Sequence, residues 1–126
     1  GNLKDSAAKC RQAVECITGK LWKKLACHIN GGISVHIRSI NNGPDLYNVT
    51  TALYRATEKG FGGIEEIHND LGLLKDKSMW SVLNKGTHVD DKIPEFTRPE
   101  IKKLLDLLEK LAKEVDHLKI KPNVVA

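Results

Sequence analysis

"TRPEIKKLLDLLEKLAKEV", residues 97–115, is the stretch that decides the fold class most clearly. Its apolar residues recur at steps of three and four, which is the spacing of one face of an α-helix, and charged residues fill most other positions. The face that we expect to be buried consists of Ile101, Leu104, Leu105, Leu108, Leu111, Ala112 and Val115. Because one helix cannot bury such a face alone, the pattern predicts partner helices around it.

The start of this helix is marked by a capping box. Thr97 precedes Arg98-Pro99 and Glu100, so the Thr97 hydroxyl can accept a hydrogen bond from the Glu100 amide. The Glu100 side chain can reach back in return. We therefore expect the helix to begin beside Thr97.

A long amphipathic helix is also predicted near the beginning of the chain, from about Asp5 to Ile29. Asp5 or Ser6 can cap its start, and the glycines of residues 30–32 stop it. Gly19 interrupts the pattern at a cost in helix propensity, so we expect it to mark a close contact with another helix. The apolar stripe consists of Cys10, Val14, Ile17, Leu21 and Leu25.

A shorter helix is expected after the turn at residues 41–45. Pro44 can sit in its first turn, since proline is tolerated where the backbone amide has no helical partner. The apolar stripe consists of Leu46, Val49, Leu53 and Ala56. It predicts a helix that extends to about Lys59 and is ended by Gly60.

A third helical stretch begins near Gly63 and contains two places where it can break, Gly72 or residues 75–77. It resumes at Ser78, and Gly86 is well placed as its terminating glycine.

"ISVHIRSI", residues 33–40, alternates apolar and polar residues, which is the pattern of a β-strand. The sequence has no second strong strand to pair with it. We interpret it as one extended segment lying on a helical body, or as one arm of a small hairpin.

Together these elements predict an all-α fold, a bundle of four to five helices with one short extended segment near residues 33–40. A length of 126 residues fits one domain with one core. No apolar run approaches the roughly 20 residues that cross a bilayer, so we expect no contact with a membrane.

Cysteine and histidine content argues against disulfides and metals. The three cysteines suggest a reducing compartment, hence the cytoplasm, and we interpret Cys10 and Cys16 as small buried thiols. The five histidines form no HxxxH pair and the cysteines form no CxxC pair, so we expect no metal site. The "GFGG" run at residues 60–63 lacks the lysine and the hydroxyl residue of a phosphate-binding loop, so no cofactor is predicted.

The net charge of +4 is unevenly distributed. Residues 1–63 carry nine Lys/Arg and four Asp/Glu, whereas residues 64–126 carry eleven and twelve. The basic half can face phosphate or can simply be a solvated surface. A nucleic-acid-binding regulator is therefore one possible function, although no predicted helix carries a dense basic face.

Three parts of the chain resemble one family. The first helix, "AAKCRQAVECITGKLWKKL" (residues 7–25, with Arg11 and Glu15), the "LNKGTHVDD" run (residues 83–91) and the leucine-rich last helix resemble the HEPN superfamily. Such ends are similar to C-terminal regions of bacterial ATP-binding proteins of the ABC/AAA type, many of them linked to defence against phage. The resemblance spans most of residues 5–118 and implies a HEPN-like bundle.

The resemblance also implies partners. HEPN domains usually dimerise, and the likeness to ATPase C-terminal regions implies an ATPase domain or subunit as a partner. Residues 1–126 would then be a single HEPN-like domain, a fragment or an accessory domain of a larger protein.

Catalytic members of the family are metal-independent ribonucleases whose motif is Arg, then four to six residues, then His. His88 matches the histidine and Asn84 the polar residue that often follows the arginine, but Leu83 occupies the position of the arginine. A histidine can move a proton, and an arginine can hold the phosphate. Lys85 can replace the arginine only as a point charge.

Three functions therefore remain open. The first is an accessory or interaction domain of a bacterial ATPase that mediates dimerisation and contacts RNA. The second is a ribonuclease with a degenerate motif that uses His88, Asn84 and Lys85, aided by Arg11 or Glu15. The third is the nucleic-acid-binding regulator.

The candidate residues also have purely structural interpretations. Asn84 and Gly86 can end a helix, after which His88 fixes the following loop through a hydrogen bond. Arg11 and Glu15 can be a solvated intrahelical pair, or a polar cluster that faces the His88 loop.

Overall fold

The computed structural model describes residues 3–26, 45–58, 64–87 and 98–119, and these contain five helices and no strand. The helices are α1 (Leu3–Ala26), α2 (Leu46–Ala56), α3 (Ile64–Leu74), α4 (Lys77–Thr87) and α5 (Arg98–His117). The predicted all-α bundle is thus confirmed. The extended segment predicted at 33–40 lies outside the described residues. None of the described helices is both long and apolar enough to cross a membrane.

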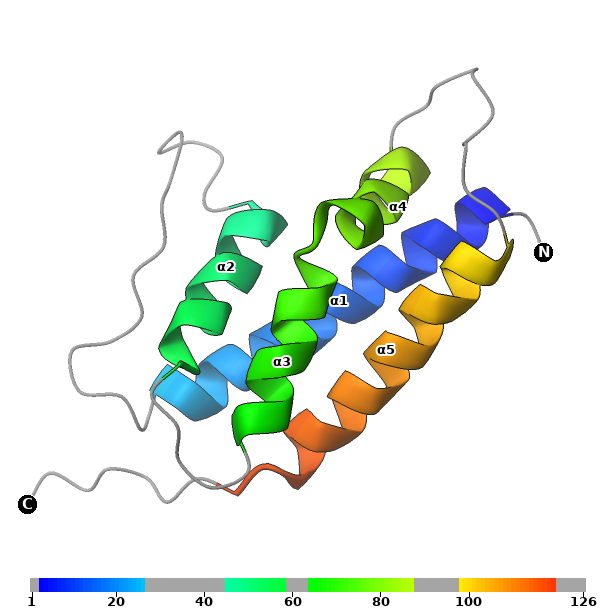
Figure 1. Ribbon diagram of the computed structural model, residues 1–126. Coiled ribbons are helices and arrows are strands. Elements are labelled where there is room, and N and C mark those ends of the chain that lie inside the picture. Colours follow the sequence, from blue (N-terminus) through cyan, green and yellow to red (C-terminus); the bar gives the residue numbers. More distant parts are fainter. Residues whose placement is uncertain (1–2, 27–44, 59–63, 88–97, 120–126) are drawn as a thin grey trace, which may run out of the picture.

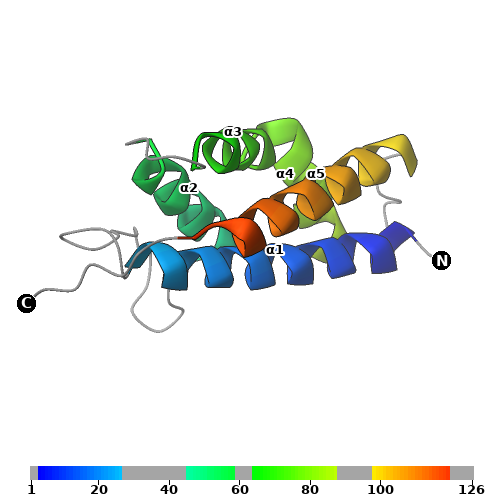
Figure 2. The same cartoon turned by 90° about the horizontal axis from the view of Figure 1, so that it is seen from below.

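The two longest helices, α1 and α5, lie side by side and run in the same direction, whereas α3 runs in the opposite direction (Figure 1). Seen from below, α1 lies along one edge of the bundle and α3 along the other, with α5 crossing between them (Figure 2). Both α1 and α3 pack against α2, α4 and α5. The core therefore lies in the middle of five helices.

The apolar stripe predicted for α1 is confirmed in full. All five of its residues are buried in one apolar cluster, to which every other helix contributes. From α3 the cluster takes Ile64, Ile67, Leu71 and Leu74. The period of the sequence was sufficient here because α1 packs against three other helices, α2, α4 and α5.

The predicted face of α5 needs one correction. Leu105 is 46% exposed, whereas Leu107, which the pattern left out, is 9% exposed. The prediction assumed that neighbours cover one side of the helix. In the structure α5 packs against α1, α3 and α4, so its buried arc is shifted around the helix axis.

Helix α2 is shorter than predicted. Asp45 is its N-cap, with a side chain that accepts a hydrogen bond from the Asn48 amide. The helix ends at Ala56, not at Lys59, and Thr57 is its C-cap.

Of the two predicted breaks between α3 and α4, the structure has the one at residues 75–77, and Gly72 lies inside α3. Asp76 begins α4, since its Oδ1 accepts from the Ser78 amide at 2.9 Å and from the Ser78 hydroxyl at 2.7 Å. These bonds lower the pKa of Asp76. The prediction that Gly86 ends the helix is wrong, because α4 continues through it to Thr87.

The C-terminal ends of α1 and α5 are tied together by a lysine. Lys24 Nζ donates to the carbonyl oxygens of Val115 at 2.5 Å and Leu118 at 3.0 Å. Lys20 Nζ lies 3.6 Å from Oδ1 of Asp116. The ammonium group of Lys24 thus lies at the carboxyl end of α5, where the helix dipole favours a positive charge.

Candidate functional site

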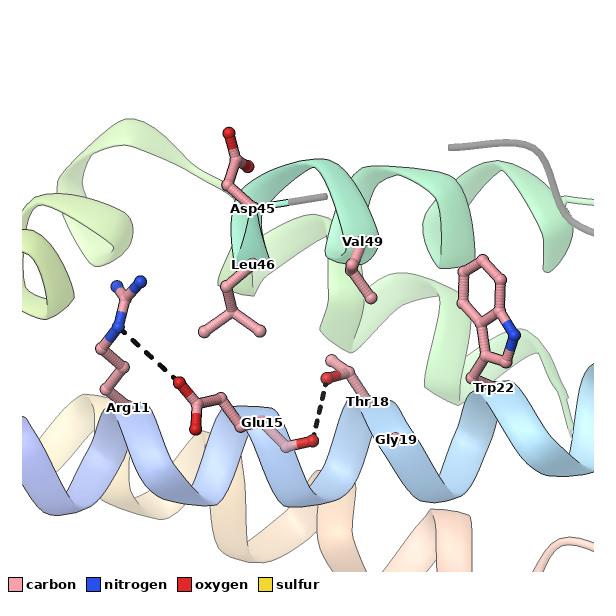
Figure 3. A pocket seen from close by; sticks show the side chains of 8 residues that line it. All are labelled: Arg11, Glu15, Thr18, Gly19, Trp22, Asp45, Leu46 and Val49. Atoms are coloured by element: carbon pink, nitrogen blue, oxygen red, sulfur yellow. Dashed lines mark hydrogen bonds and ion pairs between the residues drawn. The ribbon is translucent and has the colours of Figure 1, made fainter. Parts of the chain in front are cut away.

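An open pocket of about 460 Å³ lies between α1 and α2 (Figure 3). It is lined by Arg11, Glu15, Thr18, Gly19, Trp22, Asp45, Leu46 and Val49. Two of these residues, Arg11 and Glu15, are predicted site residues. The pocket is therefore the candidate site in the described part of the chain.

Arg11 and Glu15 lie one turn apart on α1. Nε of Arg11 is 3.9 Å from Oε1 of Glu15, and the two side chains are 30% and 59% exposed (Figure 3). An exposed pair of this length contributes little to stability. The two residues form the intrahelical pair that the sequence suggested. The alternative cluster needs His88, which lies outside the described residues.

The middle of the pocket is apolar and open. Leu46 and Val49 point from α2 toward α1, and Trp22 stands at the far end from Arg11 (Figure 3). A Cβ added to Gly19 would meet no heavy atom within 4 Å. The predicted close helix contact at Gly19 is therefore wrong. Because Gly19 has no side chain, the pocket is open to a ligand at this position.

The charged groups of the pocket do not favour a phosphate. Glu15 brings one carboxylate and Arg11 one guanidinium, whereas the Asp45 carboxylate points away from α1 (Figure 3). Both carboxylate oxygens of Asp45 accept from Asn48, from the backbone amide nitrogen at 2.8 Å and from Nδ2 at 3.2 Å. With one charge of each sign, such a lining suits an apolar group better than an anion.

The motif residues of the resemblance lie at the end of α4. Leu83 is fully buried in the core cluster. Asn84 and Lys85 belong to the last turns of α4, but their side chains lie outside the described residues, as does all of His88. The structure thus tests one position of the motif, and that position faces the core.

The cysteines divide into two kinds. Cys10 is buried, and burial raises the pKa of its thiol. Cys16 is exposed, so its interpretation as a buried thiol is wrong. Among the described residues no group of three or more His, Cys, Asp or Glu side chains could hold a metal ion.

One polar cluster that the sequence did not predict joins α2 to α3. His68 Nδ1 lies 2.9 Å from the Tyr54 carbonyl oxygen and 2.9 Å from the Thr57 hydroxyl. Since a carbonyl only accepts, Nδ1 carries the proton and donates it. The imidazole stacks on the Tyr54 ring, with centroids 4.2 Å apart. The sequence places His68 on α3 but gives no sign of its partners on α2.

A second unpredicted cluster joins α3 to α5. Lys110 Nζ lies 3.0 Å and 3.1 Å from the two carboxylate oxygens of Asp70, and 3.0 Å from Oε1 of Glu114. Asp70 follows Ile67 by one turn on the apolar stripe of α3 and is buried. An aspartate on an apolar stripe was the signal that could have found this cluster.

Comparison with known proteins identified no similar protein. No protein-family model, no curated protein and no solved structure matches the chain.

Proposed function

We propose that the chain is a HEPN-like accessory domain that works with a bacterial ATPase, forms a homodimer and contacts RNA without cleaving it. The observation that carries this proposal is the full burial of Leu83, at the position where the family's ribonucleases have their arginine. The likeness itself rests on the sequence.

Burial of Leu83 argues against catalysis for a physical reason. A guanidinium at that position would have to leave the core or be desolvated, at a cost of several kcal/mol. Without it the phosphate has no clamp from α4, and His88 would have to act with Lys85 alone in that segment. Arg11 does not offer an obvious substitute, because its Nε already faces Glu15.

The pocket between α1 and α2 supports the part of the proposal that concerns protein partners. Its apolar middle, formed by Trp22, Leu46 and Val49, can receive an apolar side chain. The Glu15 carboxylate favours a partner with a basic residue beside that side chain. Contact with RNA rests on the resemblance alone.

Cleavage of labelled tRNA and single-stranded RNA in EDTA tests the proposal. We expect the wild type to bind RNA in a gel-shift assay at low salt and to leave it intact, because the phosphate clamp is missing. His88→Ala is compared with the wild type, and His117→Ala is the control. His117 is an exposed histidine whose Nδ1 lies 2.7 Å from the Lys113 carbonyl oxygen on the same helix.

Cleavage by the wild type and by His117→Ala, but not by His88→Ala, would contradict the proposal and favour the ribonuclease. Sedimentation of the same samples gives the oligomeric state. A monomer at every concentration would contradict the proposed dimer.

A further inference from the structure

Two acidic side chains meet one lysine where α3 packs against α5. Asp70 of α3 has a side chain that is only 4% exposed, and Glu114 of α5 has one that is 15% exposed. Lys110, one turn before Glu114, lies between them at 3.0 Å from each. We call this group the α3–α5 carboxylate pair with its lysine.

One ammonium group does not supply enough hydrogen bonds for the four carboxylate oxygens of Asp70 and Glu114. Lys110 Nζ reaches both oxygens of Asp70 with good geometry. Both oxygens of Glu114 are shielded from solvent. Although Oε1 is close to Lys110, neither oxygen accepts a well-formed hydrogen bond. A buried carboxylate without hydrogen bonds is costly.

A proton would remove this deficit. Ionised carboxylates only accept hydrogen bonds, so two of them cannot bond to each other, whereas a protonated carboxyl donates to its neighbour. We propose that the Glu114 carboxyl carries a proton in the folded protein and donates it to Asp70, so that the packing of α5 on α3 weakens when this proton is lost at higher pH.

The charges around Glu114 agree with this proposal. Burial, then the hydrogen bond with Asp70, raises the pKa of Glu114, and Lys110 offsets part of the effect. The charged groups that face it are Asp70 from α3 and Lys110 from α5. From α1, Lys20 engages Asp116 and Lys24 engages the backbone at the end of α5.

The direction of the pH dependence follows from proton binding. In the unfolded chain the carboxyl of Glu114 titrates near its ordinary pKa of 4.5, and in the folded protein it titrates higher. Between these values the folded state holds more protons, so the free energy of unfolding falls as the pH rises. The contribution is fully present below the unfolded pKa and is lost as the pH passes the folded pKa.

Thermal unfolding of the wild type and of Glu114→Gln, between about pH 5 and pH 8 at constant ionic strength, tests the proposal. The glutamine amide donates to Asp70 permanently and does not titrate. We expect the difference between the Tm of Glu114→Gln and the Tm of the wild type to increase by about 3 °C or more as the pH rises. Asp70→Asn should reduce the pH dependence, because its amide can donate to the ionised Glu114, but burial of Glu114 remains and part of the dependence should persist.

Glu109→Gln is the matched control. Glu109 lies on the same helix, is 69% exposed and pairs with Lys113 at 3.4 Å, so its difference from the wild type should not change with pH. If Glu114→Gln behaved like this control, the proposal would be overturned. Carboxyl-carbon NMR of the wild type is a second readout that needs no variant. A Glu114 signal that titrates near 4.5 would equally contradict the proposal.

Discussion

Gly72 is the residue that lets Tyr54 of α2 lie against α3. A Cβ added at Gly72 would stand 3.1 Å from Cε2 of the tyrosine ring. The ring is also stacked on His68, and Lys75 Nζ lies 4.9 Å from its centroid. His68 and Gly72 lie one turn apart on α3, and Lys75 follows directly after the end of the helix, so these three residues surround the ring from one side.

Gly72→Ala should therefore destabilise the protein, although alanine is the better helix former. The gain in helix propensity is about 1 kcal/mol. Against it stands the displacement of a ring that three neighbours hold in place, and overpacking of this kind costs about 1–3 kcal/mol. We expect the free energy of unfolding, measured by urea denaturation, to fall by about 1 kcal/mol.

Gly19→Ala is the control, because Gly19 also lies inside a helix but has open space where its Cβ would be. It should raise the free energy of unfolding by about 0.5–1 kcal/mol through helix propensity alone. Equal effects of the two substitutions would show that Tyr54 yields to the new methyl group without cost.

At the scale of single residues, the sequence was sufficient to predict contacts between side chains that are close together in the chain. Arg11 and Glu15 are one turn apart, so helical spacing alone brings them together. Trp80 and Leu83 are three residues apart on α4, so helical spacing places them on one face, and both residues are buried. His68 and Asp70 depend on Tyr54 and Lys110, which belong to other helices, and helical periodicity carries no information about such partners.

Lys24 also depends on a partner from another helix, and its contact joins the ends of two whole helices, α1 and α5. Its ammonium donates to carbonyl oxygens at the end of α5, more than 90 residues away in the sequence. The carbonyl groups there also carry the negative end of the helix dipole. Lysine is part-buried at this position, so solvent screens the interaction less than on an open surface.

Lys24→Met should lower the free energy of unfolding by about 1.5 kcal/mol, which is the lower end of the usual range for a hydrogen bond to a charged group. Methionine keeps the apolar stem, so the loss reports on the ammonium. Chemical denaturation followed by circular dichroism gives the value.

The matched variant is Lys23→Met, at the exposed neighbour of Lys24. It removes the same charge from the same helix turn and should change the stability by less than about 0.5 kcal/mol. If the two variants lost the same amount, the effect would come from net charge and not from the end of α5.

Helix existence could be predicted from the sequence, whereas helix ends were less certain. All four amphipathic stripes predicted helices that are present, because periodicity extends over many residues. Ends depend on single contacts. Helix α2 stops at Ala56, beside Thr57, whose hydroxyl bonds Tyr54 and His68. Gly86 does not stop α4, because a terminating glycine is a preference and not a requirement.

The bundle as a whole rests on the arc of α5 that meets α1, α3 and α4. Leu111 is fully buried in that arc, whereas Leu105 is 46% exposed on the same helix. Leu111→Ala should lower the free energy of unfolding by about 3–4 kcal/mol, because it leaves a cavity in the packed core. We expect one cooperative transition at a lower urea midpoint, seen identically by fluorescence and circular dichroism.

Leu105→Ala removes the same atoms from the surface and should cost less than about 1 kcal/mol. The sequence pattern placed both leucines on one apolar face. A similar loss for both would mean that Leu105 is covered by a partner in solution. That outcome would place Leu105 in the interface of the proposed homodimer.

The contact between the ends of α1 and α5 has a consequence for how the protein folds. Lys24 and Leu118 are 94 residues apart in the sequence, so a long loop must close when this contact forms. Helix α1 cannot complete its contacts with α5 until both helices have been synthesised. Because closing a long loop costs more chain entropy than forming a local contact, we expect the ends of α1 and α5 to meet late in folding.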